Sequence, residues 1–144
     1  MQGVLYAAIG VVFILGLFFV DSYRRRGRME RADAGDPLDA FVTVTNTSKL
    51  SGDEVVQLYL KCPDIPGAPI RSLRGFQRIH LEPGASQKVE FRLNPRDLSM
   101  VTEAGDIIEA QGKYTVSLGG GQPGAGLPSV SGNFEIKGRM MLPE

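Results

Sequence analysis

The nine residues EVVQLYLKC, Glu54–Cys62, alternate between aliphatic and mixed side chains. One side carries Val56, Leu58 and Leu60, and the other carries Val55, Gln57, Tyr59 and Lys61. A period of two is that of an extended strand, in which successive side chains point to opposite faces of a sheet. The stretch therefore predicts a central β-strand with one aliphatic face in a hydrophobic core.

Period-two runs of the same kind occur before and after this strand. They are Phe41–Thr45, Leu73–Leu81, Gln87–Leu93, Lys113–Leu118 and Val130–Lys137, with shorter strands expected at Val101 and at Ile107–Ile108. Glycine, proline and asparagine separate the runs at spacings of about ten residues. The pattern predicts an all-β fold, an immunoglobulin- or fibronectin III-like β-sandwich of about seven strands over residues 40–138, with a short tail at 139–144.

Pro83 and Gly84 separate two of these runs and are typical of a turn. They predict that Leu73–Leu81 and Gln87–Leu93 form an antiparallel pair. Strict alternation within the first of the two runs places Leu73 on the same side as Ile79 and Leu81.

An uncharged run of eighteen residues, Gly3–Val20, stands near the start of the sequence. Twelve of them are Val, Leu, Ile or Phe, and a helix rising ~1.5 Å per residue would be about 27 Å long. That length is close to the ~30 Å hydrocarbon core of a bilayer. The run predicts one transmembrane α-helix over residues 1–23, followed by a basic juxtamembrane segment and linker over residues 24–39. A cleaved signal peptide or a buried core helix fits the flanking residues less well.

Positive charge follows this run and does not precede it. Because Lys and Arg near the ends of a span set its orientation, the sequence predicts a single-pass protein of the bacterial inner (cytoplasmic) membrane. Its N-terminus would lie outside and its C-terminal domain in the cytoplasm. The same charges would contact anionic lipid headgroups. The residues concerned are Arg24, Arg25, Arg26, Arg28 and Arg31.

Small residues recur at helical spacing in the uncharged run. Gly3, Ala7 and Gly10 would share one helix face, and small residues let a second membrane helix approach closely. The pattern favours packing against a neighbouring helix of a membrane protein complex.

The formal net charge of zero divides unequally along the chain. Residues 1–31 hold five arginines against two acidic residues, whereas residues 32–144 hold eleven Lys or Arg against fourteen Asp or Glu. A slightly acidic domain lacks the basic face that phosphate binding needs, so no nucleic-acid partner is expected. With one cysteine, Cys62, and one histidine, His80, neither a disulfide nor a metal site is expected, and no cofactor is implied.

No catalytic constellation stands out. The glycine-rich segment 119–128 lacks the GK[ST] ending of a phosphate loop, and no GxSxG is present. The acidic pairs Asp53 with Glu54 and Glu103 with Asp106 fall in turns, where solvation explains them. The sequence therefore predicts no enzyme activity and no catalytic residue.

Three aromatic residues could form a platform for a sugar. Tyr59, Phe76 and Tyr114 all fall on predicted strands. Core packing or cross-strand pairing is the favoured interpretation for aromatic residues at alternating strand positions.

Four motifs resemble a known family. They are GDEVVQLYL at Gly52–Leu60, LRGFQRIHLEPG at Leu73–Gly84, NPRDLS at Asn94–Ser99 and GKYTVSLGG at Gly112–Gly120. In this order they are similar to the fibronectin type III-like domain that closes many bacterial glycoside hydrolase family 3 enzymes, the β-glucosidases and β-xylosidases. The resemblance runs from about Phe41 to Gly138. It implies an accessory β-sandwich that packs against other protein surfaces, and it carries over no catalytic residue, because those belong to preceding α/β domains.

Together these features predict a non-catalytic, single-span membrane protein. Its β-sandwich would be an accessory or scaffolding subunit of a larger membrane complex, of respiratory or photosynthetic type, and its partners would be other subunits and the bilayer. The alternative is an extracytoplasmic carbohydrate-binding or glycoside-hydrolase-associated accessory module. Carbohydrate ranks below protein and lipid among the expected partners.

Overall fold

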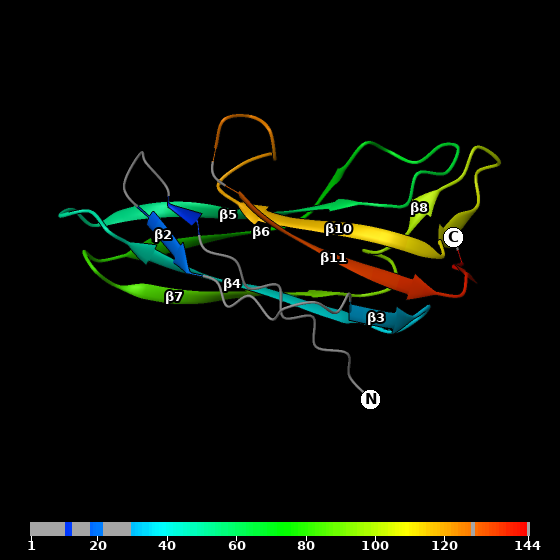
Figure 1. The fold of residues 1–144 in the computed structure, drawn as a ribbon, viewed down its shortest axis with the longest axis horizontal. Helices are drawn as coiled ribbons and strands as arrows, with labels where there is room; N and C mark the ends of the chain where they lie inside the picture. The colour runs from blue at the N-terminus through cyan, green and yellow to red at the C-terminus, as the bar shows by residue number, and fades with distance from the viewer. Residues whose placement is uncertain (1–10, 13–17, 22–29, 128, 144) are drawn as a thin grey trace.

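The strand predicted from Glu54–Cys62 lies inside a five-stranded sheet of a computed structural model, which describes residues 11–12, 18–21, 30–127 and 129–143 (Figure 1). This sheet pairs its strands in the order β3-β11-β10-β5-β6, and all its pairs are antiparallel except β3 with β11. Its strands are β3 (Glu30–Asp33), β5 (Gly52–Lys61), β6 (Ser72–Leu81), β10 (Gly112–Gly119) and β11 (Ser129–Lys137).

A second sheet packs against the first and has the order β1-β2-β4-β7. Its strands are β1 (Val11–Val12), β2 (Phe18–Asp21), β4 (Leu38–Asn46) and β7 (Ser86–Leu93). A small third sheet, β12-β9-β8, joins β8 (Met100–Val101), β9 (Ile107–Glu109) and β12 (Met140–Met141). The predicted all-β sandwich is confirmed for the described residues.

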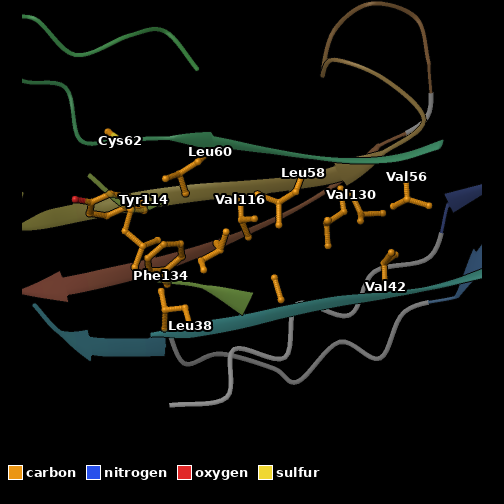
Figure 2. Packing of buried hydrophobic residues seen from close by; sticks show 14 of the residues in the cluster. Leu38, Val42, Val56, Leu58, Leu60, Cys62, Tyr114, Val116, Val130 and Phe134 are labelled. Carbon is orange, nitrogen blue, oxygen red and sulfur yellow. The ribbon is translucent and has the colours of Figure 1, made fainter. Parts of the chain in front are cut away.

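The aliphatic face of β5 lies in the core, as its alternation predicts. Figure 2 shows Leu58 and Val116 of the five-stranded sheet facing Val42 of β4 across the space between the sheets. Tyr114 and Phe134 are the largest fully buried side chains, and their rings stack with centroids 5.1 Å apart. Burial of these apolar side chains between the two sheets stabilises the fold.

The predicted pairing of Leu73–Leu81 with Gln87–Leu93 is wrong. β6 pairs with β5, whereas β7 pairs with β4 in the other sheet. The turn between them therefore crosses from one sheet to the other instead of closing a hairpin. The backbone N–H of Gly84 donates to the carbonyl of Asn46 at 2.7 Å, which ties this crossing to the end of β4.

Leu73 also lies on the opposite face from the one predicted. The register of β5 with β6 shifts between Leu58 and Tyr59, so that Leu58 is opposite Gly75 and Tyr59 is opposite Leu73, and Arg74 is left over as the extra residue. Such a bulge reverses the facing of every residue beyond it. Leu73 is consequently 48% exposed on the outer face.

The prediction of a transmembrane helix meets contrary evidence in the described residues. Val11–Val12 and Phe18–Asp21, which lie in the uncharged run except for Asp21, form antiparallel strands, and Phe18–Asp21 pairs with β4. Within the described part of the chain, no helix is long and apolar enough to cross a membrane. Strands and apolar helices use the same Val and Phe residues, so hydropathy alone did not distinguish them.

Several predictions concern residues outside the described part of the chain. These include the packing face Gly3, Ala7 and Gly10 and the headgroup contacts of Arg24, Arg25, Arg26 and Arg28. The cytoplasmic orientation and the domain boundaries stay predictions as well. Paired strands do occur within the segments expected to be a linker and a tail, namely β3 and β12.

Candidate functional site

The outer face of the five-stranded sheet carries side chains in rows that run across the strands. One row joins Asn133, Thr115 and Lys61, and the next joins Ser131, Ser117, Tyr59 and Leu73. The hydroxyl of Thr115 donates to the Asn133 side-chain oxygen at 2.8 Å, and the Ser117 and Ser131 hydroxyls are 2.7 Å apart. This face is therefore polar and rich in hydroxyl groups, opposite in character to the core face.

Two adjoining hollows open on these rows, and together we call them the Tyr59 groove. One, of about 210 Å³, is lined by Tyr59, Lys61, Arg71, Thr115, Ser117 and Pro123. The other, of about 350 Å³, shares Lys61 and Thr115 and adds Cys62, Pro63, Asp64 and Lys113.

A bridge between two loops forms one wall of the groove. Arg71, just before β6, donates a guanidinium hydrogen bond to the carbonyl of Pro123 in the connection between β10 and β11. Figure 1 shows this connection arching away from the sheet beside β5. Because 52 positions separate the two residues in the sequence, only the fold brings this wall together.

The Tyr59 groove has an excess of positive charge. Lys61, Arg71 and Lys113 line it, and Asp64 is its one lining carboxylate, 3.3 Å from the Lys61 ammonium. Both members of this ion pair are largely exposed, so water screens it and it holds Lys61 weakly. The groove is thus suited to an anionic ligand.

An apolar strip lies beside the groove on the same face, and we call it the Phe76 strip. It consists of Val55, Leu73 and Phe76. Phe76 is 71% exposed and stands opposite Gln57, one row beyond Tyr59 and Leu73. Clustered exposed apolar side chains on a polar sheet face mark a surface for contact with another molecule.

The only histidine lies farther along the same face. The His80 Nδ1 is 2.5 Å from one carboxylate oxygen of Asp53, and its Nε2 is 3.2 Å from Glu82. Arg78 donates to the other oxygen of Asp53. The hydrogen bond to Asp53, followed by that to Glu82, raises the pKa of His80, and the bonds from His80 and Arg78 lower the pKa of Asp53.

NMR titration should find the pKa of His80 above its ordinary value of 6.5. Asp53→Asn should lower the pKa of His80. Glu82→Gln should lower it less, because the hydrogen bond of His80 to Asp53 is the shorter one. Since the folded pKa is raised, the interaction stabilises the fold fully below about pH 6.5 and is lost as the pH rises through the raised value. A His80 pKa that does not change in Asp53→Asn would contradict this arrangement.

Two buried polar groups lie away from this face. Glu109 of β9 is fully buried; one of its oxygens accepts a 2.8 Å bond from the backbone of Gly35, and the other has no partner among the described residues. Burial raises the pKa of this carboxyl, as does the nearby Asp36. Arg74, the bulge residue, donates to the carbonyl of Ser99 at 2.7 Å. Both groups fasten loops to the sandwich.

The residues proposed from sequence are distributed differently from the expectation. Arg31, expected at lipid headgroups, lies on β3 with its Nε 3.2 Å from Glu135 of β11, and the lipid contact itself stays a prediction. Of the three possible platform aromatics, Tyr114 is in the core, and Tyr59 and Phe76 face outward. The sequence did not indicate the Tyr59 groove, because Arg71 and Pro123 carry no signal of their proximity.

No cluster that could hold a metal appears in the described residues, as judged by groups of three or more His, Cys, Asp or Glu. Cys62 is buried beside the groove, and burial raises the pKa of its thiol. A buried, protonated thiol is a poor nucleophile. The groups that this face presents are positive charges, hydroxyl groups and an aromatic ring.

Part of the chain is similar in sequence to known proteins. Residues 54–122 match the family described as fibronectin type III-like domain. The chain is 42% identical over 93 residues to "Probable beta-glucosidase N" of Emericella nidulans, which covers 59% of this chain and 14% of that protein. It is 45% identical over 100 residues to "Probable beta-glucosidase D" of Aspergillus oryzae, covering 66% and 13%, and 38% identical over 85 residues to "Putative beta-xylosidase" of Formosa agariphila, covering 57% and 11%.

Solved structures resemble this chain in fold. The fold matches a β-glucosidase from Listeria innocua with a TM-score of 0.72 at 22% identity over 84% of this chain and 16% of that chain, a likeness of fold alone. It also matches a β-glucosidase from Erythrobacter marinus with a TM-score of 0.68 at 29% identity, covering 76% of this chain and 14% of that chain.

These relatives correct the predicted role. Proteins that share the domain at 38–45% identity are named as glycosidases, so the prediction of a subunit of a respiratory or photosynthetic membrane complex is wrong. The chain spans between 11% and 14% of the length of these relatives.

Proposed function

We propose that this fibronectin type III-like domain is a non-catalytic accessory module of a glycoside hydrolase that acts on β-glucosides or β-xylosides. The module packs on the hydrolase body, whether that body belongs to the same polypeptide or to a separate one. The observation that carries the proposal is the identity of 42% over 93 residues with a protein named as a β-glucosidase, of which this chain covers 14%. The greater part of such a protein lies beyond the region of similarity.

The Phe76 strip supports a packing role. Leu73 and Phe76 expose their side chains on β6, which is the last strand of its sheet in the described structure. An exposed edge strand with apolar side chains is a hazard for a domain in isolation, because it favours association with other chains. A hydrolase surface that covers the strip would remove this hazard and gain the free energy of burying the apolar side chains.

The experiment uses the full chain as bait on a column, with extracts of the source organism. Proteins retained by the bait are identified by mass spectrometry, and the eluate is assayed with p-nitrophenyl β-glucoside and β-xyloside. We expect a glycoside hydrolase to be retained. The double variant Leu73→Asp/Phe76→Asp should retain at least tenfold less of it, because charged side chains replace the apolar contact.

Val101→Asp is the matched control. Val101 is 55% exposed but lies on β8 in the small third sheet. This variant should retain the hydrolase as well as the unchanged chain does. Hydrolysis of either substrate by the purified chain alone would show that the module is itself catalytic, and eluates without any glycoside hydrolase would refute the association with a separate hydrolase body.

A further inference from the structure

The Tyr59 groove offers acceptors and donors in a definite arrangement. The Tyr59 hydroxyl donates to the side-chain oxygen of Gln57 at 2.9 Å, and the Thr115 hydroxyl donates to Asn133. A hydroxyl group has one hydrogen to donate, so these two oxygens can only accept a further hydrogen bond. The groove thus presents hydroxyl oxygens that accept, beside ammonium and guanidinium groups that donate.

The positive charge of the groove is not cancelled by its surroundings. Lys113 stands opposite Glu135 on β11, but Glu135 is already bound by Arg31 at 3.2 Å. Asp64 faces only Lys61, in an exposed pair. Counting these neighbours, four cations face two carboxylates, so the charge surplus is available to a ligand.

We propose that the Tyr59 groove binds an oligosaccharide that carries a carboxylate, such as a xylo-oligosaccharide substituted with glucuronic acid. The carboxylate lies among Lys61, Lys113 and Arg71, the sugar hydroxyls donate to the Tyr59 and Thr115 oxygens, and one sugar ring lies against the Tyr59 ring. The assignment to a sugar rests on the proposed function, whereas the preference for a negative charge rests on the groove itself.

The size of the groove fits such a ligand. The two hollows, of about 210 and 350 Å³, share Lys61 and Thr115 and so lie side by side along these two side chains. Their combined extent falls within the ~300–1,000 Å³ range of ligand sites. A ligand in the Tyr59 groove would also lie next to the Phe76 strip, because Tyr59 and Leu73 are cross-strand neighbours. The glycan would then sit at the junction between the module and the hydrolase body.

The test measures binding to the full chain alone by isothermal titration calorimetry at low salt. The probes are an aldotetraouronic acid, which is a xylotriose bearing one 4-O-methylglucuronic acid, and neutral xylotetraose. We expect the acidic probe to bind at least tenfold more tightly than the neutral one, and its affinity to fall as salt is added. A hexaglutamate peptide serves as a third probe and should bind at least tenfold more weakly than the acidic sugar.

Variants locate the binding on the protein. Lys61→Gln and Lys113→Gln should each weaken binding of the acidic probe by tenfold or more, and Tyr59→Ala should weaken the binding of both sugars. Lys88→Gln removes the same charge from β7 of the other sheet and should leave the affinity unchanged. Thermal unfolding of each variant confirms that it is folded.

Each other outcome overturns the proposal. Equal affinities for the two sugars would show that charge does not contribute to binding. Hexaglutamate binding as tightly as the acidic sugar would show that the groove does not recognise carbohydrate. An absence of binding by either sugar would refute the site while leaving the association with a hydrolase, which the bait experiment measures separately.

Discussion

Phenylalanine in place of Tyr114 is expected to lower the free energy of unfolding by about 1–3 kcal/mol, and alanine by about 3–5 kcal/mol. The Tyr114 side chain is fully buried, and its hydroxyl donates to the carbonyl of Ala110 at 2.7 Å and accepts from the N–H of Ala110 at 3.0 Å. Phenylalanine keeps the ring but deprives both buried backbone groups of their partner. Alanine also opens a cavity beside Phe134, whose ring is stacked on Tyr114.

Urea unfolding followed by circular dichroism measures both changes. Tyr59→Phe is the matched control, because it removes a hydroxyl that donates to Gln57 on the half-exposed outer face. Water can replace that bond, so a loss of less than about 1 kcal/mol is expected. Equal losses in Tyr114→Phe and Tyr59→Phe would show that the bonds to Ala110 do not contribute as described.

Asn46→Asp is expected to lower the free energy of unfolding by about 3–5 kcal/mol at neutral pH, although the two side chains have nearly the same shape. Asn46 is fully buried at the end of β4, and its amide nitrogen donates to the carbonyls of Leu50, at 2.8 Å, and Leu81, at 2.9 Å. Its oxygen accepts from the backbone and hydroxyl of Ser48. A carboxylate would place a negatively charged oxygen against two carbonyl oxygens and remove the amide donor from both, although the Ser48 hydroxyl still donates to the Leu50 carbonyl at 2.7 Å.

The loss should shrink in acid, because a protonated carboxyl can again donate one hydrogen bond. The introduced carboxyl would have its folded pKa raised above about 3.9, so its stabilising protonated form is lost as the pH rises through that raised value. Asn133→Asp is the control: Asn133 is exposed and accepts from Thr115, as a carboxylate also can. A comparable loss in Asn133→Asp, or a loss at Asn46→Asp that does not depend on pH, would contradict this account.

The alternation of side chains predicted the interior of the sandwich well. The inward positions Val56, Leu58 and Leu60 are all buried, and so are Tyr114, Val116 and Leu118. Periodicity reports which residues share a face of one strand, and burial of that face then follows. It does not report which strand lies next to which, so β6 and β7 seemed to form a hairpin although they belong to different sheets.

Local irregularities account for most other differences. The bulge at Arg74 moved Leu73 to the outer face, where it became part of the Phe76 strip. Gly75 stands next to Arg74 in β6, and a glycine inside a strand often marks a bulge, but it does not show which residue is left over. The Tyr59 groove could not be predicted at all, since its wall depends on a bond between Arg71 and Pro123 from two separate loops.

The parallel contact of β3 with β11 has a mechanical consequence. β3 begins opposite Phe134 and ends opposite Lys137, and the N–H of Ala34 continues the contact with a 2.9 Å bond to the carbonyl of Lys137. In chain order, β3 is the first strand of the five-stranded sheet and β11 is the last, and the two run in the same direction. Opposed tension on the two sides of the domain would slide these strands lengthwise, so that all the bonds between them would have to rupture together. A force applied directly across β3 and β11 would therefore be shared by all the bonds of this contact.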